Sequence, residues 1–255
     1  MSDTVDLTFD GDVATLTIDR PDRLNALNEE ALDDVDAALD EARGDARALV
    51  ITGAGDTAFV AGADIARMSE MGVAEAEAYC RRGHAVMNAV EEFPAPVIAA
   101  INGYAFGGGC EFALACDLRV ASERAVIGQT EIDLGIIPGW GGTQLLQRLV
   151  SDETARRLIF FGERLDASDA HERGLVGEVV AHDELYDHVD ELAVELSEKP
   201  RHALYAAKEA LNAFHETGGE GAMTIERRAW SGLFGTADQR EGMTAFSEKR
   251  DPDFE

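Results

Sequence analysis

The chain has 255 residues, 45% hydrophobic and 28% charged, so it is long enough to bury a sizeable core within one large domain. Its 50 Asp and Glu residues outnumber 22 Lys and Arg and leave a net charge of −28, which excludes nucleic acid as a favourable partner. No apolar run reaches the roughly 18 residues of a membrane span, and the opening MSDTVDLTFDGD lacks the basic and apolar regions of a signal peptide, so we expect a soluble, cytoplasmic protein with no membrane partner.

The first two thirds of the chain alternate between strand and helix patterns. Residues 12–19, DVATLTID, are rich in Val, Thr, Leu and Ile and precede Arg20-Pro21, which predicts a strand stopped by proline. Residues 28–43 place apolar side chains at helical spacing, with acids on the opposite face. Further patterns predict strands at 48–52, 97–100 and 117–121, and helices at about 74–92 and 110–116. This alternation is typical of an α/β domain.

The last third of the chain carries helical patterns only. Helices are predicted at 185–198, 203–215 and 223–234, with no convincing strand after about residue 183. Pro200 separates the first two helices, and Gly218-Gly219 separates the last two. We therefore expect a core at residues 1–190 that holds the functional site, and a helical region at 191–255.

Cysteine and histidine usage argues against disulfides and zinc. The three cysteines, Cys80, Cys110 and Cys116, form no C-x-x-C pair and suit reduced thiols in a cytosol. The six histidines form no H-E-x-x-H motif, so we expect no catalytic metal.

The acidic residues are spread along the whole chain rather than gathered in a tail, and only three lysines accompany them. This distribution predicts a solvated acidic surface. Our hypothesis is a halophile's protein, because molar salt shortens the screening length to about 3 Å and makes such self-repulsion tolerable.

The segment Gly53-Ala-Gly55-Asp-Thr-Ala58 follows a predicted strand and matches the G-x-G-x-x-A pattern of a dinucleotide-binding turn. That fingerprint needs an amphipathic helix directly after its glycines. Residues 59–64, FVAGAD, are punctuated by glycine and are not helix-like. The pattern therefore favours a plain turn over a nicotinamide site.

A second glycine-rich segment, residues 102–111 (NGYAFGGGCE), places three glycines before an apolar helix that carries Glu111 in its first turn. A helix start presents free N–H groups and the positive end of the helix dipole. The Gly108 N–H could donate to a developing oxyanion, because glycine lets another group approach the backbone closely. Close packing alone would also explain these glycines.

A third segment, residues 128–143 (GQTEIDLGIIPGWGGT), is a long glycine-rich loop with Glu131 near its start. Long loops of this kind are often functional. Glu131 and Asp133 could equally be two more surface acids of a very acidic protein.

Five ordered motifs resemble the enoyl-CoA hydratase/isomerase (crotonase) family across nearly the whole chain. The matches are Arg20-Pro21 with Leu24 to Leu27, Ala61 to Ile65, Asn102-Gly103 with Gly107 to Glu111, Glu131 with Leu134-Gly135 and Pro138 to Gln144, and Gly242 to Phe246. The resemblance implies a spiral of ββα turns, with a helical C-terminal region that assembles homotrimers or homohexamers. It also implies an acyl-CoA thioester substrate and no separate cofactor.

By the same resemblance, the backbone N–H groups of Ala63 and Gly108 form an oxyanion hole for the thioester oxygen. Glu111 and Glu131, 20 positions apart, match the two glutamates of true hydratases. Gly139 supports the loop beside the attacking water. We expect Glu111, near a helix N-terminus, to ionise more easily and to activate water, while Glu131 delivers a proton to C2 of the substrate.

The resemblance also places the substrate-binding residues. These are Leu24 and Ala26, the loop residues Ala61, Asp64 and Ile65, the loop residue Trp140, and Lys249, which matches a position that reaches coenzyme A from a neighbouring subunit. Arg23 and Lys249 are candidate phosphate partners, although single surface cations are usually only solvated. The chain departs from the family pattern at Thr130, where a proline is common, and at Trp140, where many relatives carry a small residue. Trp140 could narrow the acyl pocket or pack in the core.

These observations predict hydration of a 2-enoyl-CoA to a 3-hydroxyacyl-CoA, and the reverse dehydration. The alternative within the family is a double-bond isomerase, which needs one carboxylate where this chain has two. A non-catalytic RNA-binding role conflicts with the net charge.

Overall fold

Six strands form the main sheet of the computed structural model, which describes residues 4–254. In spatial order they are β1 (Val5–Asp10), β2 (Val13–Ile18), β3 (Ala48–Gly53), β5 (Val97–Ile101), β7 (Leu118–Ser122) and β10 (Glu178–Val180). β1 and β2 form an antiparallel hairpin, and every later neighbour pair is parallel. The central strands are buried because helices cover both faces, which explains their continuous apolar runs.

A second sheet stands beside the first and is built from four strands of three residues each. In order these are β4 (Ala58–Val60), β6 (Tyr104–Phe106), β8 (Val126–Gly128) and β9 (Arg164–Asp166). The chain passes from β3 to β4, from β5 to β6 and from β7 to β8 before each time entering a helix. The structure is therefore a spiral of ββα turns, as predicted.

Buried side-chain amides hold successive turns of this spiral together. The Asn102 amide nitrogen donates to the carbonyl oxygens of Gly53 and Gly55 at 2.8 and 2.7 Å. Gly103 follows at a point where a Cβ would lie 2.2 Å from the Thr57 carbonyl oxygen. Only glycine lets these two backbones approach so closely. The Asn102-Gly103 motif thus fixes the step from one sheet to the other.

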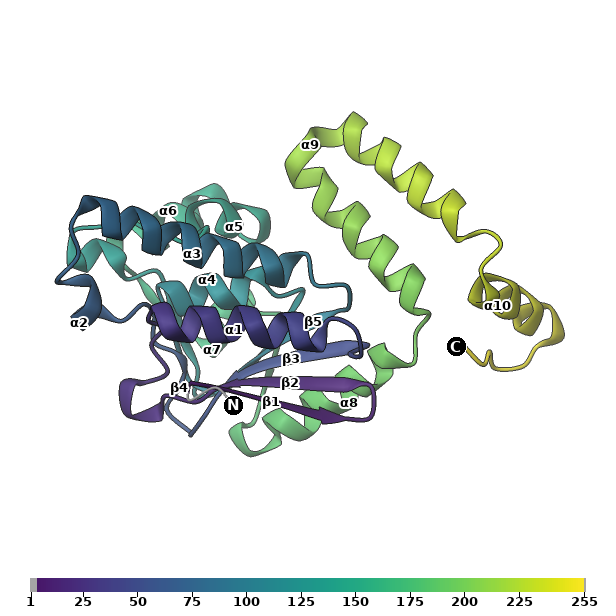
Figure 1. The fold of residues 1–255 in the computed structure, drawn as a ribbon, viewed down its shortest axis with the longest axis horizontal. Helices are drawn as coiled ribbons and strands as arrows, with labels where there is room; N and C mark the ends of the chain where they lie inside the picture. Colours follow the sequence, from purple (N-terminus) through teal and green to yellow (C-terminus); the bar gives the residue numbers. More distant parts are fainter. Residues whose placement is uncertain (1–3, 255) are drawn as a thin grey trace.

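The helices of the core are α1 (Glu29–Ala42), α2 (Ile65–Met68), α3 (Val73–Glu91), α4 (Gly108–Ala115), α5 (Gly142–Leu149), α6 (Asp152–Phe161) and α7 (Ala167–Glu172). Figure 1 shows α1 and α3 side by side over one face of the main sheet. Asn28 caps α1 by accepting a hydrogen bond from the Ala31 N–H at 2.9 Å. Every residue of α4 is buried, which agrees with its apolar sequence.

The predicted strands and helices of the core are confirmed, with ends that shift by one or two residues. The three-residue strands β4, β6, β8 and β9 were not predicted, and neither was β1. Three residues are too few for alternation to be recognised, so the second sheet has almost no periodic signal in the sequence.

Helix α8 (Leu185–Ser197) crosses the predicted boundary at residue 190 and covers the other face of the main sheet. Leu185, Val189 and Ala193 belong to one apolar cluster with sheet residues such as Val50 and Ile98. The proposed division of the chain at residue 190 stays a prediction. Residues 1–3 of the first predicted region and Glu255 of the second lie outside the described part of the chain.

The last part of the chain, beyond about residue 218, lies away from the core in Figure 1. α9 (Arg201–Leu233) folds back on itself at Gly218, whose φ of 71° is non-helical, and α10 (Ala237–Glu248) follows. The two arms of α9 correspond to the predicted helices 203–215 and 223–234, whereas α10 was not predicted. Within residues 4–254 no helix is long and apolar enough to cross a membrane.

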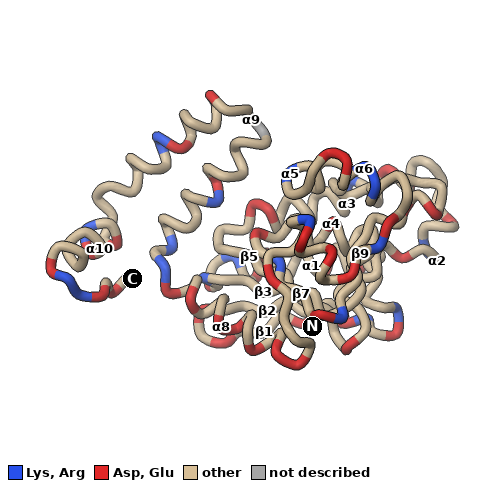
Figure 2. Tube along the Cα trace, turned by 180° about the vertical axis from the view of Figure 1, so that it is seen from behind, with Lys and Arg blue, Asp and Glu red and all other residues tan. Residues whose placement is uncertain are grey.

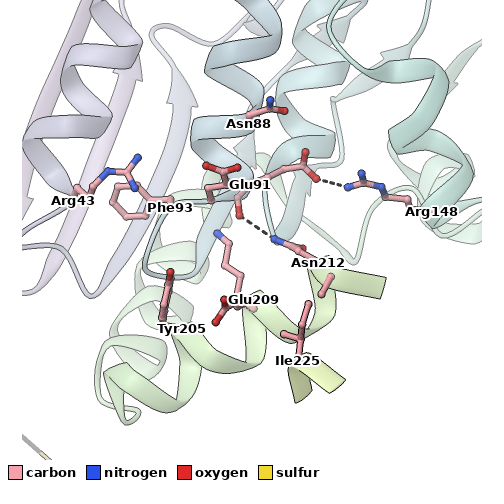
Figure 3. A pocket seen from close by; sticks show the side chains of 12 residues that line it. Arg43, Asn88, Glu91, Phe93, Arg148, Tyr205, Glu209, Asn212 and Ile225 are labelled. Carbon is pink, nitrogen blue, oxygen red and sulfur yellow. Dashed lines mark hydrogen bonds and ion pairs between the residues drawn. The ribbon is translucent and has the colours of Figure 1, made fainter. Parts of the chain in front are cut away.

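A charged cavity of about 440 Å³ lies where the first arm of α9 meets the core (Figure 3). Arg148 forms an ion pair with Glu91, and the Asn212 amide donates to the Glu91 carbonyl oxygen at 3.0 Å. The Lys208 ammonium is buried and donates to Asp117 at 2.7 Å and to two backbone carbonyl oxygens. These contacts attach α9 to the core.

Asp and Glu residues, red in Figure 2, are spread along the tube over the core and over α9 and α10 alike. Most are exposed to solvent, so the predicted solvated acidic surface is confirmed. No group of three or more His, Cys, Asp or Glu that could hold a metal ion occurs among the described residues.

Candidate active site

A cavity of about 340 Å³ opens where the loops after β4, β6 and β8 meet. We call it the active-site cavity. Its lining is Ala61, Gly62, Ala63, Ile65, Met68, Met71, Ala76, Tyr79, Cys80, Gly107, Gly108, Glu111, Thr130, Glu131, Leu134, Ile136, Ile137, Gly139 and Trp140. Most of these residues are apolar, and only two are carboxylates. The loop at residues 61–65, the glycine-rich segment before Glu111 and the loop that carries Glu131 therefore meet in one cavity.

Glu111 lies in the first turn of α4 and is 1% exposed. Its Oε1 accepts hydrogen bonds from the Trp140 and Gly142 N–H groups, both at 2.7 Å. Burial raises the pKa of Glu111, and the backbone N–H groups of Gly142, Trp140 and Gly139 oppose that rise. The loop after β8 thus holds one oxygen of this carboxylate in place.

Glu131 begins a short 3-10 helix (Glu131–Leu134) and is 8% exposed. Burial raises its pKa to about 7, and the nearby charge of Glu111 adds to the rise. Oriented so that both groups are satisfied, the buried Gln129 amide donates to Oε1 and Oε2 of Glu131 at 2.9 and 3.1 Å. Gln129 was not singled out from the sequence. It precedes Glu131 by two positions, and no motif distinguishes it from other loop residues.

The two carboxylates are neighbours without a cation between them. No described Lys, Arg or His contributes to the pKa shift of either group, so neither carboxylate is neutralised by an ion pair. Desolvation and mutual repulsion favour a state in which at least one of them is protonated. An arrangement of this kind can accept a proton at one carboxylate and supply one from the other.

The backbone N–H groups of Ala63 and Gly108 both belong to residues that line the cavity. Ala63 forms a parallel bridge with Leu27, in which Leu27 bonds to the carbonyl of Gly62 and the N–H of Asp64. That pattern directs the N–H of Ala63 itself away from Leu27. Gly108 is the first residue of α4, where an N–H has no partner within the helix.

Trp140 fills a slot between α3 and α4. A Cβ on Gly83 would lie 2.1 Å from the indole nitrogen, and a Cβ on Gly108 would lie 2.3 Å from the ring. Tyr79 packs edge-on against the indole, with ring centroids 5.4 Å apart. The tryptophan is 3% exposed, so it is both a core residue and part of the cavity wall. Gly83 was not singled out from the sequence.

The predicted substrate-binding residues fall into two groups. Ala61, Ile65 and Trp140 line the cavity, whereas Leu24, Ala26, Asp64 and Lys249 do not. The backbone at Leu24 is strained, with a φ of 52°. Its carbonyl accepts a hydrogen bond from the Ala61 N–H at 3.0 Å and so supports the loop that lines the cavity. Their contacts with a substrate stay predictions.

Asp64 and Lys249 have structural contacts of their own. Asp64 caps α2 by accepting from the Arg67 N–H at 3.2 Å and lies 3.5 Å from Arg20, whose guanidinium also donates to the Ala26 carbonyl. Lys249 ends α10 in a left-handed conformation, on the segment that stands apart from the core in Figure 1.

Comparison with known proteins identifies the family of this chain. The Enoyl-CoA hydratase/isomerase family model matches residues 8–255. The chain is 43% identical over 246 residues to a short-chain-enoyl-CoA hydratase of Clostridium acetobutylicum, covering 96% of this chain and 94% of that protein. It is also 43% identical to a crotonyl-CoA hydratase of Syntrophomonas wolfei, covering 95% and 94%.

The solved enoyl-CoA hydratase of Bacillus anthracis superposes with a TM-score of 0.94 at 36% identity, covering 98% of both chains. The chain therefore belongs to the enoyl-CoA hydratase/isomerase family and has its spiral fold.

Proposed function

We propose that this protein is an enzyme that adds water across the double bond of a 2-enoyl-CoA, and catalyses the reverse dehydration. The observation that carries the proposal is that two buried carboxylates, Glu111 and Glu131, line one cavity and that no described cation contributes to the pKa shift of either. The relatives named as short-chain-enoyl-CoA hydratase and crotonyl-CoA hydratase support it.

The thioester carbonyl would bind between the N–H groups of Ala63 and Gly108. Negative charge develops on that oxygen when water attacks C3, and a fixed N–H donor at such a position is typically worth about 2.7–4 kcal/mol in the transition state. The direction of the Ala63 N–H and the free N–H at the start of α4 support this assignment. Coenzyme A enters as part of the substrate, and we propose no separate cofactor.

Glu111 would accept the proton that the attacking water loses, and Glu131 would supply the proton that C2 gains. One O–C3 bond and one C2–H bond form while the C2=C3 π bond and one O–H bond of water break, so each turnover consumes one water. Transfer of the proton from Glu111 back to Glu131 restores the pair for the next turnover. Two N–H donors hold Glu111 Oε1 and favour its charged form, as a base requires. A pKa of about 7 keeps Glu131 partly protonated at neutral pH, as a donor requires. Gly139 would support the loop that supplies these donors.

A double-bond isomerase of the same family would need one carboxylate to move a proton between C2 and C4. The chain places two in the cavity, with neither diverted into an ion pair. This pairing favours hydration.

The acyl group is proposed to be short. Trp140 occupies the slot between Gly83 and Gly108, so its indole takes space at the cavity wall that a longer chain would need. We expect Trp140→Ala to raise the ratio of kcat/KM for a ten-carbon enoyl-CoA to kcat/KM for crotonyl-CoA by about tenfold. Room for one or two more methylenes in a hydrophobic pocket typically changes kcat/KM by at least this much. An unchanged ratio in a folded variant would contradict this role of Trp140.

We also infer a homotrimer or homohexamer formed through the C-terminal helices. The second arm of α9 and helix α10 lie away from the core and expose large apolar side chains, including Trp230 and Phe246 at 63% and 85% exposure. Such exposed apolar surface is typical of an interface. In the assembly Lys249 would reach coenzyme A bound to a neighbouring copy. Free cysteines at all three described positions are consistent with a cytoplasmic location.

Loss of the enoyl-thioester absorbance of crotonyl-CoA tests the proposed reaction. The purified protein should remove that absorbance rapidly in molar KCl, and the product should be 3-hydroxybutyryl-CoA. A folded protein that leaves crotonyl-CoA intact would contradict hydration and favour the isomerase.

A further inference from the structure

One peptide group connects Glu111 to a thiol on α3. The peptide between Gly139 and Trp140 donates its N–H to Glu111 Oε1 at 2.7 Å, and its C=O accepts from the Cys80 Sγ at 2.8 Å. The N–H and C=O of a trans peptide point in opposite directions, so the peptide lies between the two side chains. Both of its polar groups are therefore used, one by the carboxylate and one by the thiol.

Cys80 is suited to be a donor at this position. It is half-buried in α3, lines the active-site cavity, and lies 3.8 Å from His84 Nδ1. Burial raises the pKa of the Cys80 thiol, and the charges of Glu111 and Glu77 raise it further while Arg81 opposes them. The sulfur therefore keeps its proton at neutral pH, and that proton can be donated to the Gly139 carbonyl.

Donation to the Gly139 carbonyl affects the opposite end of the same peptide. It polarises the amide, which makes the Trp140 N–H a stronger donor. It also fixes the rotation of a peptide that follows Gly139, a residue with no side chain to anchor it. Both effects favour the charged form of Glu111.

We propose that Cys80 is a positioning residue, which holds the Gly139–Trp140 peptide so that its N–H stays aimed at Glu111. This inference deepens the proposed hydratase function and rests on it. Cys116 does not share the role. Cys116 is buried and donates to the carbonyl of Phe112 in its own helix at 3.4 Å.

The test compares Cys80→Ala, which removes the donor, with Cys80→Ser, which keeps one, and with Cys116→Ser as a matched control. Cys80→Ala should lower kcat for crotonyl-CoA by about 5- to 30-fold, the range of a lost hydrogen bond, with KM within about twofold. The acid limb of its kcat–pH profile should move to higher pH, because Glu111 loses support for its charge. Cys80→Ser should recover most of both effects, and Cys116→Ser should match the wild type.

Carbon-13 NMR titration of labelled glutamate carboxyls provides a readout that does not depend on activity. The Glu111 signal, assigned with Glu111→Gln, should titrate at higher pH in Cys80→Ala than in the wild type or Cys80→Ser. A Glu111 pKa equal in all three proteins would overturn the positioning role. Equal losses in the Ala and Ser variants would also overturn it, because size and not donation would then matter. Absence of crotonyl-CoA hydration in the wild type, by contrast, would refute only the proposed function.

Discussion

The active-site cavity and the charged cavity are similar in size and both are lined by glutamates, but they differ in whether a cation pairs with a carboxylate. In the charged cavity Arg148 pairs with Glu91, and Lys208, which also lines this cavity, pairs with the neighbouring Asp117 at 2.7 Å. In the active-site cavity Glu111 accepts from backbone donors and Glu131 from an amide donor, and no described cation contributes to the pKa shift of either.

This difference separates structural carboxylates from those able to transfer protons. A carboxylate beside a cation is held in its charged form and has no reason to take up a proton near neutral pH. Burial without a cation has the reverse effect, and it raises the pKa of Glu131 to about 7. The chain has 50 Asp and Glu residues. The burial of a carboxylate and the charges around it, rather than its residue type, decide whether it can transfer protons near neutral pH.

The largest expected effect is on catalysis. Glu111→Gln and Glu131→Gln should each lower kcat for crotonyl-CoA by roughly 10²- to 10⁴-fold, because each removes one member of the acid–base pair. Glu91→Gln, in the charged cavity, is the matched control and should leave kcat within about twofold. Steady-state absorbance kinetics measures all three. Equal losses at Glu91 and Glu111 would remove the distinction between the cavities.

The next effect is on stability. Lys208→Met leaves Asp117 without its buried partner and should lower the free energy of unfolding by about 3 kcal/mol, the lower end for a broken buried pair because Asp117 is partly exposed. Urea unfolding followed by circular dichroism measures the loss. The kcat per folded molecule should not change. A large fall in kcat at unchanged stability would instead make the charged cavity part of the catalytic machinery.

Glu131→Gln should stabilise the protein at high pH. The folded pKa of Glu131 is raised to about 7, so the native state binds more protons than the unfolded state between about pH 4.5 and 7, and its stability falls as pH rises through that window. The neutral glutamine removes this cost. We expect roughly 1–3 kcal/mol of added stability at pH 8 and little difference at pH 4. A variant that is less stable than the wild type at pH 8 would show that Glu131 is held by favourable contacts.

The smallest effect concerns salt. The unfolding midpoint should rise by roughly a few degrees between low salt and molar KCl, since the exposed acids repel one another less when screened. The pKa of Glu131 read from the kcat–pH profile should move much less, because buried charges are screened weakly. Thermal melts and pH–rate profiles at two KCl concentrations measure both. A midpoint that does not respond to KCl would contradict the proposed adaptation to salt.

Several features followed from the sequence by itself. The long amphipathic helices and the apolar central strands have clear periodicity, so α1, α3, β3 and β5 were predicted within one or two residues. The glycines before Glu111 and the loop with Glu131 marked the two carboxylates, and the family resemblance paired them. These signals are local, or lie in motifs that stay in order along the chain.

Only the tertiary structure decided what surrounds those carboxylates. Cys80 meets the Gly139 carbonyl across 59 positions, and Glu111 meets the Trp140 N–H across 29. Gly83 has no distinguishing signal in the sequence, and only the fold shows that the indole of Trp140 packs against it. Side chains far apart in sequence meet where the turns of the spiral stack. Burial and hydrogen bonding set the pKa of each glutamate. Both depend on how the chain packs and cannot be read from the local sequence around each glutamate.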